Sequence, residues 1–196
     1  MTLVLASASS ARRSLLENAG LTFEIVPAEI DERAAEAPLI ETGATPEDLA
    51  TALAMVKAVS VSETRPGDLI IGADQMLELD GERMTKPKDM DAARHQLLRL
   101  SGKTHQLHSA VVCAREGTIL WQHSETARMT MRRVTPQFVG RYLAAVGNDA
   151  LKSVGVYQLE GRGIQLFEAV EGDFFGILGL PLIPLLAFLR SEGLLE

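Results

Sequence analysis

The sequence predicts an α/β fold, a single domain over residues 1–196 in which a mixed, twisted sheet is flanked by helices. Strand-like apolar runs alternate along the chain with segments of helical periodicity, an order typical of α/β proteins. The pair Asp80-Gly81 lies between two alternating stretches and indicates a hairpin. The length of 196 residues is usual for one domain, and we find no repeat, low-complexity tract or linker.

Short strands and helices are expected in the first third of the chain. The predicted elements there are strands at 2–6 and 23–27 and helices at 10–20 and 46–62. The helix start at Thr45-Pro46 follows from a capping hydroxyl, a proline in the first turn and acidic residues after it. Residues 28–45 are acidic and alanine-rich without clear periodicity, so we expect a loop or lid there.

The rest of the chain alternates in the same way. The run DLIIGAD predicts a central strand that delivers Asp74 at its carboxyl end. The further predicted elements are a helix at 89–100, two extended stretches at 104–116 and 118–133 joined by Gly117 as an antiparallel pair, a helix at 135–145, a strand at 163–170, and a turn or strand leading into a buried C-terminal helix.

Composition excludes several classes of function. Lys and Arg number 19 against 26 Asp and Glu, and the formal charge of −7 argues against a surface that grips a nucleic-acid polymer by general charge. An anionic ligand would therefore need local cations. Cys113 is the single cysteine and is expected to be a buried hydrophobe, which fits a reducing cytoplasm. Neither a signal peptide nor a membrane-spanning run is apparent, so we expect no membrane partner.

The stretch LASASSARRSLL, residues 5–16, joins a strand to the beginning of a helix. Backbone N–H groups, the hydroxyls of Ser7 and Ser9 and the guanidinium of Arg12 would together suit a phosphate. The alternative is that serine caps the helix while the arginines face solvent.

Acidic and basic candidates lie in separate segments. Asp31-Glu32 and Asp74 could hold a hard divalent cation or activate water, although most acidic residues are ordinary surface groups. Lys57 lies in an apolar helical segment, and Lys86 precedes a proline that restricts its backbone; either lysine could also simply be solvated. The four histidines lack metal-ligand spacing, and no serine has the context of a nucleophile elbow.

In this order the motifs resemble the Maf family of nucleoside triphosphate pyrophosphatases, whose fold is similar to that of the inosine triphosphatase (Ham1) group. The resemblance covers nearly the whole chain. It rests on LASAS…R..LL at 5–16, Asp31-Glu32, LAMVKA at 53–58, IIGAD at 70–74, Lys86-Pro87, LSGKTH at 100–105, VGVYQLEG at 154–161 and GLPL at 179–182.

This resemblance implies hydrolysis between the α and β phosphates, which releases a nucleoside monophosphate and pyrophosphate. It implies Mg²⁺ or Mn²⁺ as cofactor, held by Glu32 and Asp74, with Asp74 also orienting or deprotonating the attacking water. Family members commonly form homodimers. The residues that the resemblance assigns to the phosphates are Ser7, Arg12, Lys57 and Lys86.

Three departures from the commonest family pattern point to the nucleotide. Ala11 stands where many members carry an arginine, Gln75 where they carry threonine, and Glu160 where they carry glutamine. A carboxylate only accepts hydrogen bonds, so Glu160 suits the two adjacent donors of guanine better than a uracil edge. The pattern resembles the branch associated with 7-methyl-GTP, and Gln75 and Glu160 become substrate-binding candidates. Glu160 as a second metal ligand or surface carboxylate is the alternative.

Other functions stay open at this point. The chain could be a dTTP or UTP pyrophosphatase, or a hydrolase of deaminated purines such as ITP. A regulatory protein that binds a cell-division partner at the septum without turnover is a further alternative. Asp74, Lys86, Lys57 and Glu32 together favour catalysis, because a binding module need not retain all four.

Overall fold

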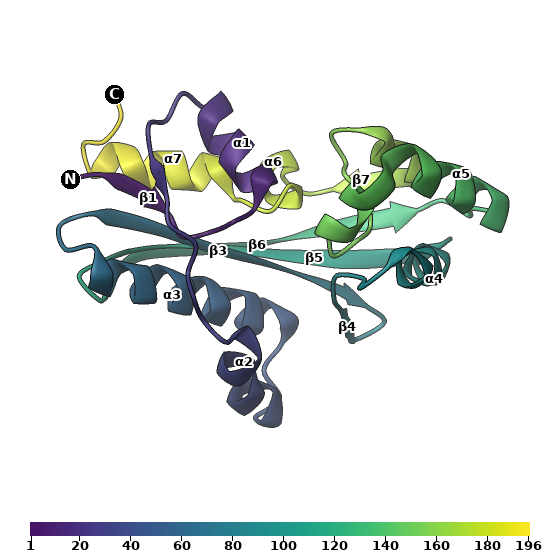
Figure 1. The fold of residues 1–196 in the computed structure, drawn as a ribbon, viewed down its shortest axis with the longest axis horizontal. Helices are drawn as coiled ribbons and strands as arrows, with labels where there is room; N and C mark the ends of the chain where they lie inside the picture. Colours follow the sequence, from purple (N-terminus) through teal and green to yellow (C-terminus); the bar gives the residue numbers. More distant parts are fainter. The chain divides into compact units, whose positions relative to one another are not determined.

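A computed structural model describes residues 1–196 (Figure 1). The chain forms two compact units. Unit 1 contains residues 1–75, 108–125 and 173–196, and unit 2 contains residues 76–107 and 126–172. Three long strands run through both units: β3 (Leu69–Leu79), β5 (Thr104–Arg115) and β6 (Thr118–Met131).

Unit 1 holds the parallel part of the sheet. Its strand order is β2-β1-β3-β5-β6, and β1 pairs in parallel with both of its neighbours. Its remaining elements are β1 (Leu3–Leu5), β2 (Glu24–Ile25), α1 (Ser10–Asn18), α2 (Glu32–Glu41), α3 (Pro46–Thr64), α6 (Phe174–Ile177) and α7 (Leu182–Ser191).

Alternating side chains build two apolar layers in unit 1. Leu5 and Ile71 belong to a core cluster with leucines of α1 and α7, whereas Val4 and Ile70 pack with Val61 of α3. Helix α3 therefore covers one face of the sheet, and α1 and α7 cover the other, as Figure 1 shows. Within residues 69–74 of β3, even-numbered residues face α3, and odd-numbered residues face α1 and α7.

Unit 2 holds antiparallel pairs. Strand β4 (Glu82–Met84) pairs with β3, and β7 (Phe167–Glu171) pairs with β6. Asp80 and Gly81, at φ 55° and 82°, form the turn that the sequence predicts. The helices are α4 (Met90–Leu100), α5 (Pro136–Val146) and the 3₁₀ helices η1 (Gly147–Lys152) and η2 (Arg162–Leu166). The predicted mixed sheet with flanking helices is confirmed.

Three local predictions are wrong. The expected loop at 28–45 contains α2, because the Asp31 carboxylate accepts a hydrogen bond from the N–H of Ala34 and caps a helix whose short length hides its periodicity. Asp74 is not at a strand end, because β3 continues to Leu79 through the hairpin pairing with β4. The first half of the strand expected at 163–170 is the 3₁₀ helix η2.

None of the helices is both long and apolar enough to span a lipid bilayer.

Candidate functional site

Gly72 lets α3 approach β3 closely, and this contact sets the geometry of the site. A Cβ atom at Gly72 would lie 2.2 Å from the carbonyl oxygen of Ala54 and 2.7 Å from the backbone nitrogen of Ala58. The even-numbered face of β3 carries Asp74 two residues further on, and α3 carries Lys57 one residue before Ala58. The backbone contact therefore brings the lysine to the carboxylate.

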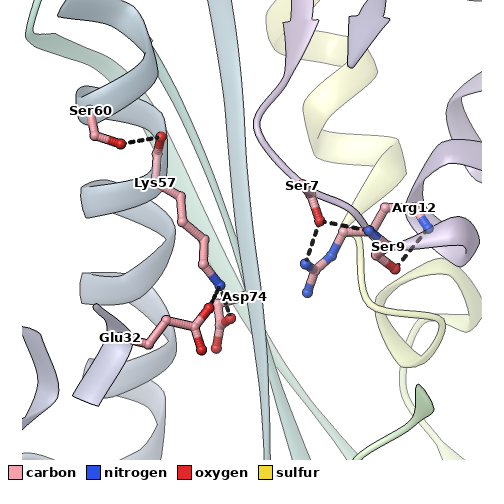
Figure 2. Close-up of polar contacts among 7 residues, drawn as sticks. All are labelled: Ser7, Ser9, Arg12, Glu32, Lys57, Ser60 and Asp74. Atoms are coloured by element: carbon pink, nitrogen blue, oxygen red, sulfur yellow. Dashed lines mark hydrogen bonds and ion pairs between the residues drawn. The ribbon is translucent and has the colours of Figure 1, made fainter. Parts of the chain in front are cut away.

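Lys57 joins two carboxylates. Its Nζ lies 2.7 Å from Oδ1 of Asp74 and 2.6 Å from Oε1 of Glu32 (Figure 2). The side chains of Lys57 and Asp74 are 11% and 14% exposed, whereas that of Glu32 is 52% exposed. Glu32 occupies the first turn of α2 directly after the capping Asp31, so the helix predicted as a loop is what positions it. We call Glu32, Lys57 and Asp74 the triad.

Ser7 and Arg12 form a second group, at the beginning of α1. Arg12 donates from Nε to the carbonyl oxygen of Gly179 at 2.8 Å and from Nη1 to Oγ of Ser7 at 3.1 Å. Ser9 caps the helix, and Figure 2 shows its hydroxyl accepting from the backbone N–H of Arg12. The sequence left open a phosphate site or a serine cap with solvent-facing arginines. The structure has the serine cap, but the guanidinium of Arg12 is buried.

Burial and charge oppose each other at Arg12. Desolvation lowers the pKa of its guanidinium, and the negative charges of Asp74 and Glu32 act in the opposite direction. The electrostatic effect of both carboxylates on Arg12 links the Ser7–Arg12 group to the triad. Arg13, in contrast, is exposed and pairs with Glu17 at 2.7 Å, as expected of a surface residue.

Gln75 faces the side of the sheet opposite to Asp74. Its Nε2 donates to Oγ of Ser109 at 2.9 Å and lies 3.0 Å from the carbonyl oxygens of Gly176 and Ile177. Ser109, which is buried, donates in turn to the carbonyl oxygen of Gly176 at 2.8 Å. The amide therefore holds the α6 turn that leads to Gly179. Sequence reasoning missed Ser109, whose only signal is a polar residue at the edge of the apolar run SAVVCA.

Both groups lie where β1 ends. Leu5 pairs with Ile71, and β3 continues past this pair to Asp74 and beyond. Since β1 has parallel neighbours on both sides, its carboxyl end is the position at which open α/β sheets place ligands. Loop residue Ser7 and β3 residue Asp74 thus border the same end of β1.

Two predicted residues lie in unit 2. Lys86 is exposed in the segment between β4 and α4, beside the buried Pro87. Glu160 is exposed in a turn that precedes η2. The other six site candidates, Ser7, Arg12, Glu32, Lys57, Asp74 and Gln75, all belong to unit 1.

The donor set fits a hard divalent cation that keeps open positions. No three His, Cys, Asp or Glu side chains group closely enough to enclose a metal ion. Two carboxylates do converge on one cationic atom, Nζ of Lys57. Mg²⁺ is typically bound in this way, by one or two carboxylates together with waters and substrate phosphates.

Two histidines, the cysteine and the tryptophan contribute to packing. His105 and His108 are buried, and burial lowers the pKa of His105 to about 4, so its imidazole is neutral at pH 7. Cys113 lies within the core, where burial raises the pKa of its thiol. Trp121 stacks on Phe188 of α7 with ring centroids 5.1 Å apart.

Comparison with known proteins finds relatives that match nearly the whole chain. The chain is 59% identical to the 7-methyl-GTP pyrophosphatase of Brucella abortus biovar 1, over 99% of this chain and 98% of that protein. It is 49% identical to the nucleoside triphosphate pyrophosphatase of Granulibacter bethesdensis, over 98% of both chains. The Staphylococcus aureus Ham1 structure superposes with a TM-score of 0.51 at 16% identity, covering 97% of this chain and 98% of that one, so the predicted Ham1-like fold is confirmed. The Maf-like protein model matches residues 2–192, and the chain belongs to this family.

Proposed function

We propose that this chain is a metal-dependent nucleoside triphosphate pyrophosphatase that acts as one domain. The observation that carries the proposal is the triad: two carboxylates and an ammonium meet at the carboxyl end of β1, and both carboxylates act electrostatically on the buried Arg12. Scattered cations supply the positive site that a chain of net charge −7 does not provide overall. The homodimer and the cytoplasmic location stay predictions from the sequence.

Each residue has a role that follows from its chemistry. Arg12, fixed at two of its nitrogens, would direct its remaining N–H groups to a phosphate, with the Ser7 hydroxyl beside it. Lys57 and Lys86 would neutralise charge on the phosphate chain. Asp74 would orient the attacking water and accept its proton while the bond between the α and β phosphates breaks.

Glu32 and Asp74 would hold the divalent cation. Bound there, the cation would neutralise phosphate charge as a Lewis acid and help to fix the geometry of displacement. This assignment is supported by the two carboxylates that converge on Lys57 Nζ, because carboxylate oxygens that surround a cationic group are also the ligands that a hard divalent cation prefers.

The substrate we propose is 7-methyl-GTP. Support comes from relatives of that name at up to 59% identity and from Glu160, whose carboxylate matches adjacent N–H donors of guanine. Initial rates of pyrophosphate release from 7-methyl-GTP, GTP, dTTP, UTP, CTP and ITP with Mg²⁺ test this. We expect the highest kcat/KM for 7-methyl-GTP; a preference for dTTP or ITP would contradict the substrate, and no release from any of the six would contradict the activity.

Asp74→Asn distinguishes an enzyme from a binding protein. The substitution keeps the shape of the side chain and removes the base, so we expect pyrophosphate release to fall by about 10²- to 10⁴-fold while nucleotide binding remains. Asp80→Asn is the matched control, because Asp80 is exposed and pairs only with Lys103 at 2.7 Å in unit 2. Equal activity of Asp74→Asn and the control would remove Asp74 from the mechanism.

A further inference from the structure

Val156 has a strained backbone within the segment of residues 154–161. Its φ is 64°, although it is β-branched, and its side chain is fully buried. A β-branched residue in this region is a clear outlier, and such strain persists only where the surroundings enforce it.

Three side chains from three elements of unit 2 hold this segment. Gln96 of α4 donates from Nε2 to the carbonyl oxygen of Val154. Tyr142 of α5 donates its hydroxyl to the carbonyl oxygen of Val156 at 3.3 Å. His105 of β5 is hydrogen-bonded through Nε2 to the hydroxyl of Tyr157 at 2.6 Å. We call these three side chains the anchors. They hold Val156 itself, Val154 before it and Tyr157 after it.

The end of the segment is a compact turn around Gln158. The carbonyl oxygen of Gln158 accepts from the backbone N–H groups of Gly161 at 3.2 Å and Gly163 at 3.1 Å. A Cβ atom at Gly163 would lie 2.4 Å from that same oxygen, so the turn closes only with glycine there. Glu160 lies within this turn and is exposed. The hydrogen-bonded turn therefore fixes the backbone that carries the exposed carboxylate of Glu160.

We propose that Gln96, Tyr142 and His105 are positioning residues that hold segment 154–161 in its strained form, so that Glu160 meets the nucleotide base in one orientation and base preference is retained. This inference rests on the proposed function, because it assigns the base contact to Glu160. None of the three side chains need touch the nucleotide. They act through the backbone of the segment.

The protonation states of the anchors suit a permanent clamp. Burial raises the pKa of Tyr142 to about 12, although a hydrogen bond with the backbone of Gln158 acts in the opposite direction; the charge of Glu160 adds to the rise, so the hydroxyl stays a donor at neutral pH. The effect of Glu160 on the pKa of Tyr142 also places the hydroxyl and the carboxylate within electrostatic range of each other. His105 is neutral at pH 7 because burial lowers its pKa to about 4.

Tyr142→Phe tests the proposal with the loss of one hydroxyl. We expect KM for 7-methyl-GTP to rise by about two- to tenfold, the range of one net hydrogen bond, while kcat changes by less than about twofold. The ratio of kcat/KM for 7-methyl-GTP to that for dTTP should fall, because a mobile Glu160 discriminates less. An unchanged ratio would overturn the proposal.

Ser101→Ala is the matched control. Ser101 accepts from the N–H of Val134 at 2.8 Å and donates to the carbonyl oxygen of Val134 at 3.3 Å, so this variant also loses hydroxyl bonds to backbone in unit 2, but away from segment 154–161. We expect it to leave the substrate ratio unchanged. If Ser101→Ala lowers the ratio as much as Tyr142→Phe does, the effect is general loosening and the positioning role is refuted.

A further measurement separates this inference from the proposed function. Hydrogen exchange at residues 154–161 should be faster in Tyr142→Phe than in the wild type and in Ser101→Ala, whatever the activity; equal exchange would overturn the anchoring. Failure of the proposed function would appear separately, as a wild-type protein without pyrophosphate release.

Discussion

Arg12 is buried and its neighbour Arg13 is exposed. Substitutions at the two positions therefore give a matched test of whether the Ser7–Arg12 group binds phosphate. Arg12→Lys keeps the charge, but a single ammonium cannot reproduce the fork that reaches both Gly179 and Ser7. We expect affinity for the nucleotide to fall at least about tenfold and the protein to lose roughly 1.5–3 kcal/mol of stability in urea denaturation, the range for hydrogen bonds to charged groups.

Arg13→Lys provides the control for that substitution. Arg13 is exposed and pairs with Glu17 on the same helix, so its replacement should change stability by less than about 0.5 kcal/mol. Affinity for the nucleotide should stay at the wild-type value. Equal losses of affinity in the two variants would show that the helix as a whole, and not the buried guanidinium, binds phosphate.

The burial of Glu125 predicts that the free energy of unfolding depends on pH. Burial, and secondarily the charge of Asp173, raise its pKa from 4.5 to about 7, and its Oε1 atom is buried without a hydrogen-bond partner. Because the folded-state pKa is the higher one, its stabilising contribution is complete below about pH 4.5 and is lost as the pH rises through about 7. Glu125→Gln should flatten the decline in urea midpoint between pH 5.5 and 8. An equal decline of the urea midpoint in the wild type and in Glu125→Gln would contradict this prediction.

At the scale of elements, α2 connects a helix cap to the triad. Asp31→Ala removes the hydrogen bond to the N–H of Ala34, at 3.1 Å, which should cost about 0.5–2 kcal/mol. Hydrogen exchange at residues 32–41 should accelerate, and turnover should fall several-fold because Glu32 loses its fixed position. Thr135→Ala removes the equivalent cap of α5, at 3.2 Å from Phe138, and should leave turnover unchanged. Slow exchange in α2 of Asp31→Ala would refute the prediction.

Local signals made most elements predictable from the sequence, and long-range contacts explain what was missed. The capping box at Thr45 and Asp48 and the turn at Asp80-Gly81 depend on residues within a few positions, so the sequence reveals them. The bond from Arg12 to Gly179 spans 167 positions, and no local pattern encodes it. Comparison of motifs predicted the six site residues in unit 1. It did not predict their hydrogen-bond partners, such as Ser109, because tertiary packing brings these partners together.

At the scale of the whole molecule, ligand binding should stabilise the fold through the triad and Arg12. A chain of net charge −7 attracts a triphosphate only where local cations are arranged, so binding must draw on the folded state and not on general charge. A ligand present at about 100 times its Kd adds about 2.7 kcal/mol.

For a domain of this size that addition corresponds to a rise in Tm of roughly 5–10 °C. A nucleotide whose α–β bridging oxygen is replaced by a methylene group permits the measurement by calorimetry without turnover. We expect the full rise with Mg²⁺ and a smaller one with EDTA, because the carboxylates of Glu32 and Asp74 would then repel the phosphates and keep Lys57 engaged. Glu32→Gln should abolish the difference between Mg²⁺ and EDTA; a rise that depends on Mg²⁺ to the same extent in this variant would place the metal elsewhere in the chain.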